Sequence, residues 1–201
     1  MSETPQKKSY ATLWVLIAVT MLPIAGAWFY YAFYDYLPHF ESSNNGDLVT
    51  PGRPIEQFSL DSLDGQSYTA NAFRGKWTLL TAGSSICLEQ CEKNIYTIRQ
   101  VRLATDRDRE RVQRLFILDD RKQLTDFLNK LEGYEGMAVA TGNRQSLNEF
   151  YAILDDDKGQ VLDRIYIVDP LGNYMMSYPV GIDPELILED LKRLLKVSKI
   201  G

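Results

Sequence analysis

Cys87 and Cys91 are the only two cysteines in the 201-residue chain, and they stand four positions apart. Two thiols at this spacing can close a disulfide or, when reduced, hold one soft metal ion such as Cu(I). They are too few for a disulfide scaffold or for structural zinc, which takes a larger set of nitrogen and sulfur ligands. Cys87 and Cys91 are therefore candidate catalytic residues for thiol–disulfide exchange and candidate metal ligands.

The cysteine pair is expected in a loop and the first turn of a helix. On a regular helix, residues four apart share a face, but both Cβ atoms point toward the helix start and strain a bridge between them. A helix N-terminus favours the thiolate, whereas the negative charges of Glu89 and Glu92 disfavour it. A plain structural disulfide remains an alternative, although so short a loop constrains the unfolded chain little.

The elements around the pair predict an α/β domain. The apolar run Trp77–Thr81 predicts a central strand that leads into the cysteines, and residues 89–105 have the apolar spacing of a helix that leaves them. Asp64-Gly65 predicts a hairpin turn. Further strands are expected at 55–60, 66–69, 112–118, 137–140, 162–168 and 174–178, and further helices at 120–131, 144–154 and 184–197. This order predicts a mixed sheet flanked by helices.

Residues 11–34 form a charge-free apolar run that predicts a transmembrane helix. At about 1.5 Å per residue the run spans about 36 Å, enough to cross a hydrocarbon core of about 30 Å. Lys7 and Lys8 precede it, and the next basic residue is Arg53. The positive-inside rule then predicts a cytoplasmic tail at 1–10 and everything after the anchor outside. A cleaved signal peptide is the alternative, because Ala25-Gly26-Ala27 matches a small-x-small cleavage pattern.

The predicted organisation is a linker at 35–50 followed by one domain at 51–201. The only histidine, His39, falls in the linker, where a solvated side chain is expected rather than a third metal ligand. No Arg-rich transit peptide precedes the apolar run, which favours a bacterial inner membrane. The prediction is a single-pass protein whose C-terminal domain faces the periplasm.

The charge pattern excludes one class of partner. The net charge of −5 argues against nucleic acid, whose binding proteins carry basic footprints. Six arginines crowd residues 99–114, but Asp106, Asp108 and Glu110 interleave with them. This pattern favours a solvated helix end and turn over an anionic docking site.

The motifs, taken in order, resemble those of the Sco/SenC family. The likeness covers about residues 50–197 and rests on the hairpin at Asp64-Gly65, on Arg74-Gly75-Lys76, on the Cys87-x-x-x-Cys91 pair before a long helix, and on Tyr166-Ile167-Val168-Asp169-Pro170-Leu171-Gly172-Asn173. The resemblance implies a membrane-anchored, thioredoxin-like protein. It also implies a role in delivering copper to cytochrome oxidase or in reducing its copper-site cysteines. The implied partners are the copper-site subunit of the oxidase or its assembly factors.

The chain departs from that family at the residues that would hold copper. Leu88 and Glu92 stand where family members usually have proline. The family's copper-binding histidine would fall near Val161 or Leu162, and the predicted domain contains no histidine. No cofactor is therefore certain, and the weight shifts from copper carriage toward thiol–disulfide exchange. Transient Cu(I) relay by the two thiolates and a non-catalytic interaction module remain the alternatives.

Two further expectations concern chemistry at the pair. In exchange, one cysteine attacks a partner disulfide and the other resolves the mixed disulfide. Cys87, nearer the loop, is the expected attacker. A peroxiredoxin is disfavoured, because Leu80 and Ser84 stand where that motif has proline and threonine.

Overall fold

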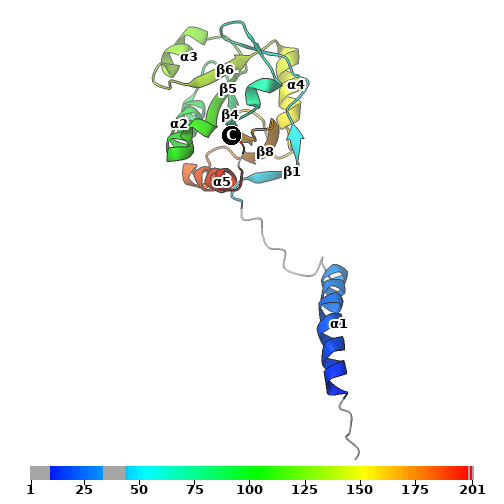
Figure 1. Cartoon of the computed structure of the whole chain (residues 1–201). Coiled ribbons are helices and arrows are strands. Elements are labelled where there is room, and N and C mark those ends of the chain that lie inside the picture. Colours follow the sequence, from blue (N-terminus) through cyan, green and yellow to red (C-terminus); the bar gives the residue numbers. More distant parts are fainter. Residues whose placement is uncertain (1–9, 34–43, 199, 201) are drawn as a thin grey trace, which may run out of the picture. The chain divides into compact units, whose positions relative to one another are not determined.

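The structure is a computed structural model that describes residues 10–33, 44–198 and 200 (Figure 1). Residues 1–43 and 44–201 form two separate units. Most of the expected cytoplasmic tail, part of the expected linker and His39 lie outside the described residues.

The first unit contains the helix α1 (Ala11–Ala32). Among the described residues it is the one helix long and apolar enough to cross a membrane, a property that anchors and signal sequences share. The Thr20 hydroxyl donates to the carbonyl oxygens of Leu16 and Ile17, both at 3.0 Å, so this polar group is satisfied within the helix. The predicted apolar helix is confirmed.

The second unit is built on one mixed sheet of eight strands in the order β1-β8-β7-β4-β5-β6-β2-β3. The central strands β4, β5 and β6 run parallel, and β7 pairs with β4 antiparallel. The strands are β1 (Asp47–Pro54), β2 (Leu60–Ser62), β3 (Ser67–Tyr68), β4 (Trp77–Gly83), β5 (Val112–Leu118), β6 (Met137–Thr141), β7 (Ile165–Val168) and β8 (Asn173–Tyr178).

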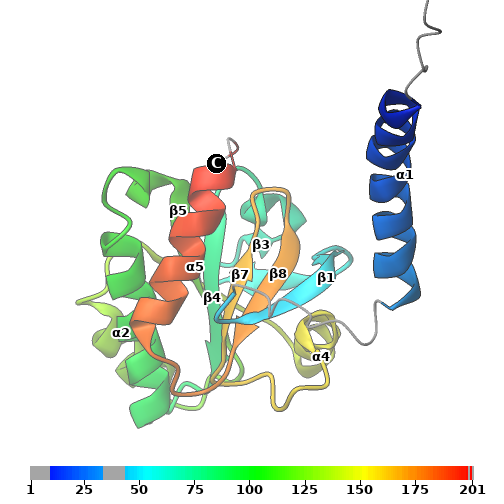
Figure 2. The same cartoon turned by 90° about the horizontal axis from the view of Figure 1, so that it is seen from below.

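Helices cover both faces of this sheet (Figure 2). Besides two short 3-10 turns, η2 (Ala70–Phe73) and η3 (Asp106–Arg111), they are α2 (Glu89–Leu103), α3 (Leu124–Leu131), α4 (Arg144–Leu154) and α5 (Pro184–Val197). Helices α2 and α5 pack side by side on one face, and α4 lies on the other. Asp183 caps α5 by accepting from Glu185 N at 3.0 Å, and Asn143 caps α4 by accepting from Ser146 N at 2.9 Å.

Strand alternation sorts the core side chains between the two faces. Every residue of β4 is buried, as expected for a central strand covered on both sides. Leu80 pairs with Leu115 and packs in the cluster under α4, whereas Leu79 pairs with Arg114 and packs under α2 and α5. Because successive side chains point to opposite faces, Arg114 lies on the α2 face with Phe116.

The entry to the domain differs from the prediction. The expected strand at 55–60 is wrong: residues 55–59 hold no strand, and β1, which was not expected, precedes them. Pro51, Gly52 and Pro54 are typical of a linker, but an edge strand tolerates them, and β1 pairs only with β8 in the sheet order. Residues 44–50 of the expected linker therefore belong to the domain. Helix α3 also begins at Leu124 rather than at 120.

Asp190 of α5 fastens this entry segment. Its buried carboxylate accepts from the backbone N–H groups of Asn45 at 2.9 Å and Gly46 at 3.0 Å, and from the Tyr178 hydroxyl at 3.1 Å. The start of the domain is thus tied to its last helix.

Replacing Asp190 with alanine is expected to lower the free energy of unfolding by about 2 kcal/mol, because buried donors to a charged acceptor lose their partner. Chemical denaturation followed by circular dichroism measures the loss. Glu185→Ala, an exposed change on the same helix, is the matched control. Equal stability of the two variants would show that Asp190 does not fasten the segment.

Candidate functional site

Cys87 and Cys91 are joined in a disulfide, with their Cα atoms 5.0 Å apart. Cys87 lies in the loop after β4, and Cys91 lies in the first turn of α2, which begins at Glu89. The predicted placement in a loop and a first helical turn is confirmed. The backbone at Cys87 is left-handed, with φ of 43°, so the bridge is not built on a regular helix.

Hydrogen bonds hold the loop that presents the pair. Cys87 N donates to Ser84 O at 3.1 Å and closes a turn. The buried Ser85 hydroxyl donates to Asp120 Oδ1 at 2.5 Å and accepts from Gln123 N at 2.9 Å. The loop is therefore tied to the segment between β5 and α3.

Asp120 supplies the charge that holds this loop. Burial alone would raise the pKa of its carboxyl, but hydrogen bonds from Ser84, Ser85 and the backbone of Lys122 lower that pKa to about 2. Asp120 is therefore a carboxylate at neutral pH.

The sulfurs lie under a partly apolar rim. Cys87 is 2% exposed and Cys91 is 5% exposed, so exposure does not distinguish attacker from resolver. They pack with Ile95, Phe116 and Phe127. Ile86 and Leu88, which flank Cys87, are exposed. A cavity of about 270 Å³ adjoins the pair and is lined by Ser84, Ile86, Cys87, Leu88, Gln90, Cys91 and Asp163.

Lys130 of α3 offsets the acidic charge beside the pair. Its Nζ donates to Cys87 O at 2.9 Å and forms an ion pair with Glu92. The glutamate that replaces a family proline is thus paired with a cation from another helix. Its effect on the thiolates is smaller than the sequence alone predicts.

Asp163 is the site residue that sequence reasoning missed. A Cβ placed on Gly83 would lie 3.5 Å from Asp163 Oδ1 and 3.7 Å from Cys91 Sγ, so carboxylate and sulfur face the same small space. Burial raises the pKa of this carboxyl. Asp163 N donates to Ala82 O at 2.9 Å, and Asn94 Nδ2 donates to Asp163 O at 2.8 Å. Its place just before β7 is near the expected position of the family histidine, the only signal that pointed there.

Replacing Asp163 with asparagine is expected to stabilise the oxidised protein near neutral pH. A carboxyl whose folded pKa is raised contributes stability below its unfolded pKa and loses it as pH rises through the folded value. The variant should therefore match the wild type in acid and unfold at a higher temperature at pH 7 to 8. Thermal unfolding across pH measures this, with Asp157→Asn as an exposed control. A stability difference that does not change with pH would contradict it.

The donors around the pair do not fit a resident copper centre. Among the described residues, no group of three or more His, Cys, Asp and Glu side chains could hold a metal ion. The nearby carboxylate of Asp163 is a hard ligand, whereas Cu(I) prefers soft ones.

Comparison with known proteins identifies the fold. The profile of the family described as "transmembrane-like, thioredoxin-like, C-terminal domain" matches residues 77–198. No curated protein sequence matches the chain.

Solved structures are similar at low identity. Copper-bound yeast Sco1 has a TM-score of 0.59 at 18% identity, over 73% of this chain and 96% of that one. A SCO1/SenC family lipoprotein from Bacillus anthracis gives 0.57 at 20% identity, over 72% and 96%. The thioredoxin domain of a thiol-disulfide oxidoreductase from Bacteroides vulgatus gives 0.52 at 18%, over 72% and 94%. The predicted thioredoxin-like fold, and the resemblance to Sco/SenC proteins in fold, are confirmed.

Proposed function

Because this chain belongs to the transmembrane-like, thioredoxin-like C-terminal domain family, we propose that it is a membrane-anchored thiol–disulfide exchange factor for the assembly of a respiratory cytochrome oxidase. The observation that carries the proposal is the Cys87–Cys91 disulfide at the N-terminus of α2. Exposed Ile86 and Leu88 beside it offer an apolar contact for a partner protein.

The exchange begins from the reduced pair. The Cys87 thiolate attacks a disulfide on the copper-site subunit or on one of its assembly factors, and one partner sulfur leaves as a thiolate that takes a proton. Cys91 then attacks Cys87 Sγ, which closes the Cys87–Cys91 disulfide and releases the second partner sulfur. Two electrons pass to the partner, and a dithiol donor must reduce the pair again before another turn.

Asp163 has a role in the second step. Its carboxyl faces the space beside Cys91 Sγ, and its raised pKa makes it a better proton acceptor than a solvated aspartate. It takes the proton of the Cys91 thiol as that sulfur attacks. The N-terminus of α2 stabilises the thiolate that forms there.

The proposed location follows from the sequence. The helix α1 serves as an uncleaved anchor in a bacterial inner membrane, and the domain faces the periplasm, where a cysteine pair can stay oxidised. Lys7 and Lys8 before the helix support this orientation. Membrane-fraction protein that still begins at Met1 is the expected result, and a shortened N-terminus would identify a signal peptide.

Gene deletion tests the proposed function. We expect the deletion strain to lose most of its cytochrome oxidase activity and the wild-type gene to restore it. A variant with serine at both Cys87 and Cys91 should fail to restore activity, whereas Arg107→Gln, an exposed change away from the pair, should succeed. Full oxidase activity without the gene would exclude the assembly role. Restoration by the double serine variant would point to an interaction module that uses no thiol chemistry.

Cu(I) relay is the second candidate, favoured by two sulfurs on residues whose Cα atoms are 5.0 Å apart. With two thiolates and no third soft ligand among the described residues at the pair, we expect the reduced full chain to lose Cu(I) to a competing chelator under anaerobic titration. Retention of about one Cu(I) that disappears in Cys87→Ser would make relay the better description.

A further inference from the structure

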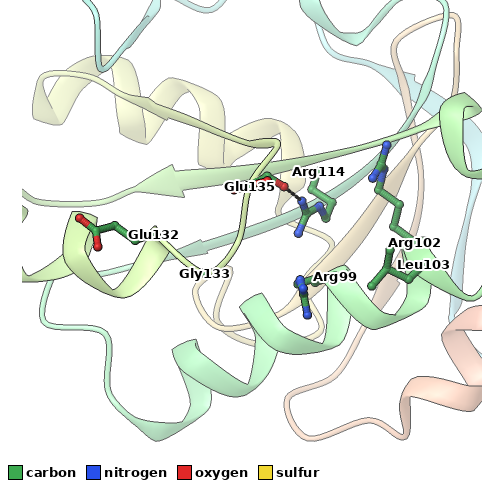
Figure 3. A pocket seen from close by; sticks show the side chains of 7 residues that line it. All are labelled: Arg99, Arg102, Leu103, Arg114, Glu132, Gly133 and Glu135. Atoms are coloured by element: carbon green, nitrogen blue, oxygen red, sulfur yellow. Dashed lines mark hydrogen bonds between the residues drawn. The ribbon is translucent and has the colours of Figure 1, made fainter.

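A second pocket is lined by the C-terminal half of α2, whereas Cys91 lies in the first turn of that helix. Figure 3 shows the side chains that line this pocket. Its volume is about 340 Å³. Arg99 and Arg102 come from the C-terminal half of α2, and Arg114 comes from β5 beneath it. The other lining residues are Leu103, Glu132, Gly133 and Glu135. The sequence predicted that six arginines lie in a solvated helix end and turn. Three of the six therefore line a single pocket instead.

Arg114 is the least ordinary member of this group. It is only 3% exposed, and its Nη2 donates to the backbone oxygen of Glu135. Its buried Nε and Nη1 atoms have no hydrogen-bond partner. Buried guanidinium groups are normally paired with an anion, because a buried charge without a counter-ion, and buried N–H donors without acceptors, lower the stability of the fold. The position thus lacks a counter-ion.

The protein itself supplies no such counter-ion among the residues that the structure describes. Arg102 Nη2 lies 3.8 Å from Glu110, and no described carboxylate is within ion-pair distance of Arg99 or Arg114. The Glu132 side chain points away from the three arginines (Figure 3). Burial, and then the positive charges of Arg102 and Arg99, lower the pKa of Arg114 to about 10. The lining therefore carries an excess of positive charge, and Arg99 and Arg114 are outside any ion pair with a described carboxylate.

The other two arginines are held in place before any ligand arrives. The Arg99 guanidinium lies over the Tyr134 ring, with its Cζ 5.8 Å from the ring centre. Arg102 Nε donates to Val112 O at 2.6 Å. The C-terminal end of a helix attracts cations, which accounts for Arg102 on α2. It does not account for Arg114, which lies on a strand.

We propose that Arg99, Arg102 and Arg114 form a binding site for a phosphate group. Guanidinium groups present paired N–H donors that match the oxygens of phosphate, and several of them around one anion offset their mutual repulsion. The cavity volume is at the small end for ligand pockets, which suits inorganic phosphate, a small phosphate ester or a phosphorylated lipid headgroup. The site is separate from the cysteine pair and does not depend on the proposed function.

The test uses the full chain in nonionic detergent micelles, with inorganic phosphate as the probe and chloride at matched ionic strength as the reference. Phosphate, but not chloride, is expected to raise the unfolding temperature in a saturable way. Arg99→Gln should weaken phosphate binding about tenfold, the effect of losing one charge-assisted contact. Arg107→Gln removes the same charge from an exposed position outside the pocket and should leave binding unchanged. Arg114→Gln should abolish binding; because Arg99→Gln alone decides the question, a folding defect at the buried position would not matter.

A second arm separates the possible sources of the phosphate group. The chain in phosphatidylcholine nanodiscs is compared with the chain in nanodiscs that also contain phosphatidic acid. Stabilisation by the acidic lipid that inorganic phosphate does not compete away assigns the site to a headgroup, and stabilisation by inorganic phosphate alone assigns it to the free ion. Equal effects of chloride and phosphate, equal losses in Arg99→Gln and Arg107→Gln, or no response to either probe would overturn the proposal.

Discussion

A Cys91→Ser variant of the full chain is expected to accumulate a mixed disulfide through Cys87 and to lose turnover by at least about 100-fold. Without Cys91 Sγ no internal sulfur can displace the partner, so the intermediate can be released only by an external thiol. The reduced variant is mixed with membranes that contain assembling oxidase, alkylated, and separated on a non-reducing gel. The expected product is a heavier species that a reductant dissolves and in which mass spectrometry identifies Cys87.

The reciprocal variant identifies the attacker. Both sulfurs are almost fully buried, so the assignment rests on position: Cys87 precedes α2, while Cys91 is held in its first turn and faces Asp163. Cys87→Ser should therefore trap little, and Lys93→Ala, an exposed change on α2 that keeps both thiols, should turn over normally. If only Cys87→Ser forms a mixed disulfide, Cys91 is the attacker and Cys87 the resolving cysteine. If neither variant forms a mixed disulfide, thiol–disulfide exchange is excluded.

The sequence predicts the site better than its surroundings. The spacing of the two cysteines after an apolar run predicted that they lie in a loop and the first turn of a helix. The structure has both cysteines at these positions. The predicted helix bounds agree with the structure where an N-cap residue precedes apolar residues with clear helical spacing. This is the case at Asn143 before α4 and at Asp183 before α5. These signals are local, because the side chains that define them lie within a few residues of one another.

Features made by long-range contacts could not be predicted in the same way. β1 is composed like a linker and is a strand only because β8 offers it an edge. Asp163 has no local pattern, and its role depends on Gly83 and Cys91, which come from elements distant in sequence. The arginines at 99 and 114 share a pocket because the β4–β5 register turns Arg114 toward α2. The number of charged residues in a segment does not show which of their side chains become buried away from water in the fold.

Asp156 is a further example, because it lies within an acidic turn yet its side chain is buried. Its two carboxylate oxygens accept from Arg164 Nη1 at 2.7 Å and Nη2 at 3.2 Å, and its side chain and that of Arg164 are 6% and 4% exposed. Ser177 Oγ donates to Asp156 Oδ2 at 2.7 Å, and the Tyr174 hydroxyl lies 3.1 Å from the same oxygen. Burial would raise the pKa of Asp156, but the bonds from Arg164 and Ser177 hold it well below its usual range. This ionic cluster joins the turn to β7 and β8.

Replacing Asp156 with alanine is expected to lower the free energy of unfolding at pH 7 by about 3 kcal/mol, because it leaves the buried Arg164 charge with only the longer, half-exposed ion pair to Asp47 at 3.6 Å. Since the folded pKa of Asp156 is depressed, its contribution is present above the unfolded value and is lost as pH falls through the folded one. The difference between wild type and variant should therefore shrink in strong acid. Denaturant titrations across pH measure both effects, with Asp157→Asn as the exposed control, because asparagine tolerates the left-handed backbone at this position (φ of 60°).

A double variant separates the charge from the packing. Asp156→Leu with Arg164→Met replaces the ion pair by apolar groups, and we expect it to be more stable than Asp156→Ala. Arg164 O accepts from the Thr81 hydroxyl at 2.9 Å, and Arg164 directly follows Asp163. Disruption of the pair should therefore also slow thiol exchange, by moving the carboxyl that faces Cys91. If Asp156→Ala costs no more than Asp157→Asn, the cluster does not hold the fold. If Asp156→Ala destabilises the domain yet leaves exchange unchanged, Asp163 is positioned by β4 and Asn94 alone.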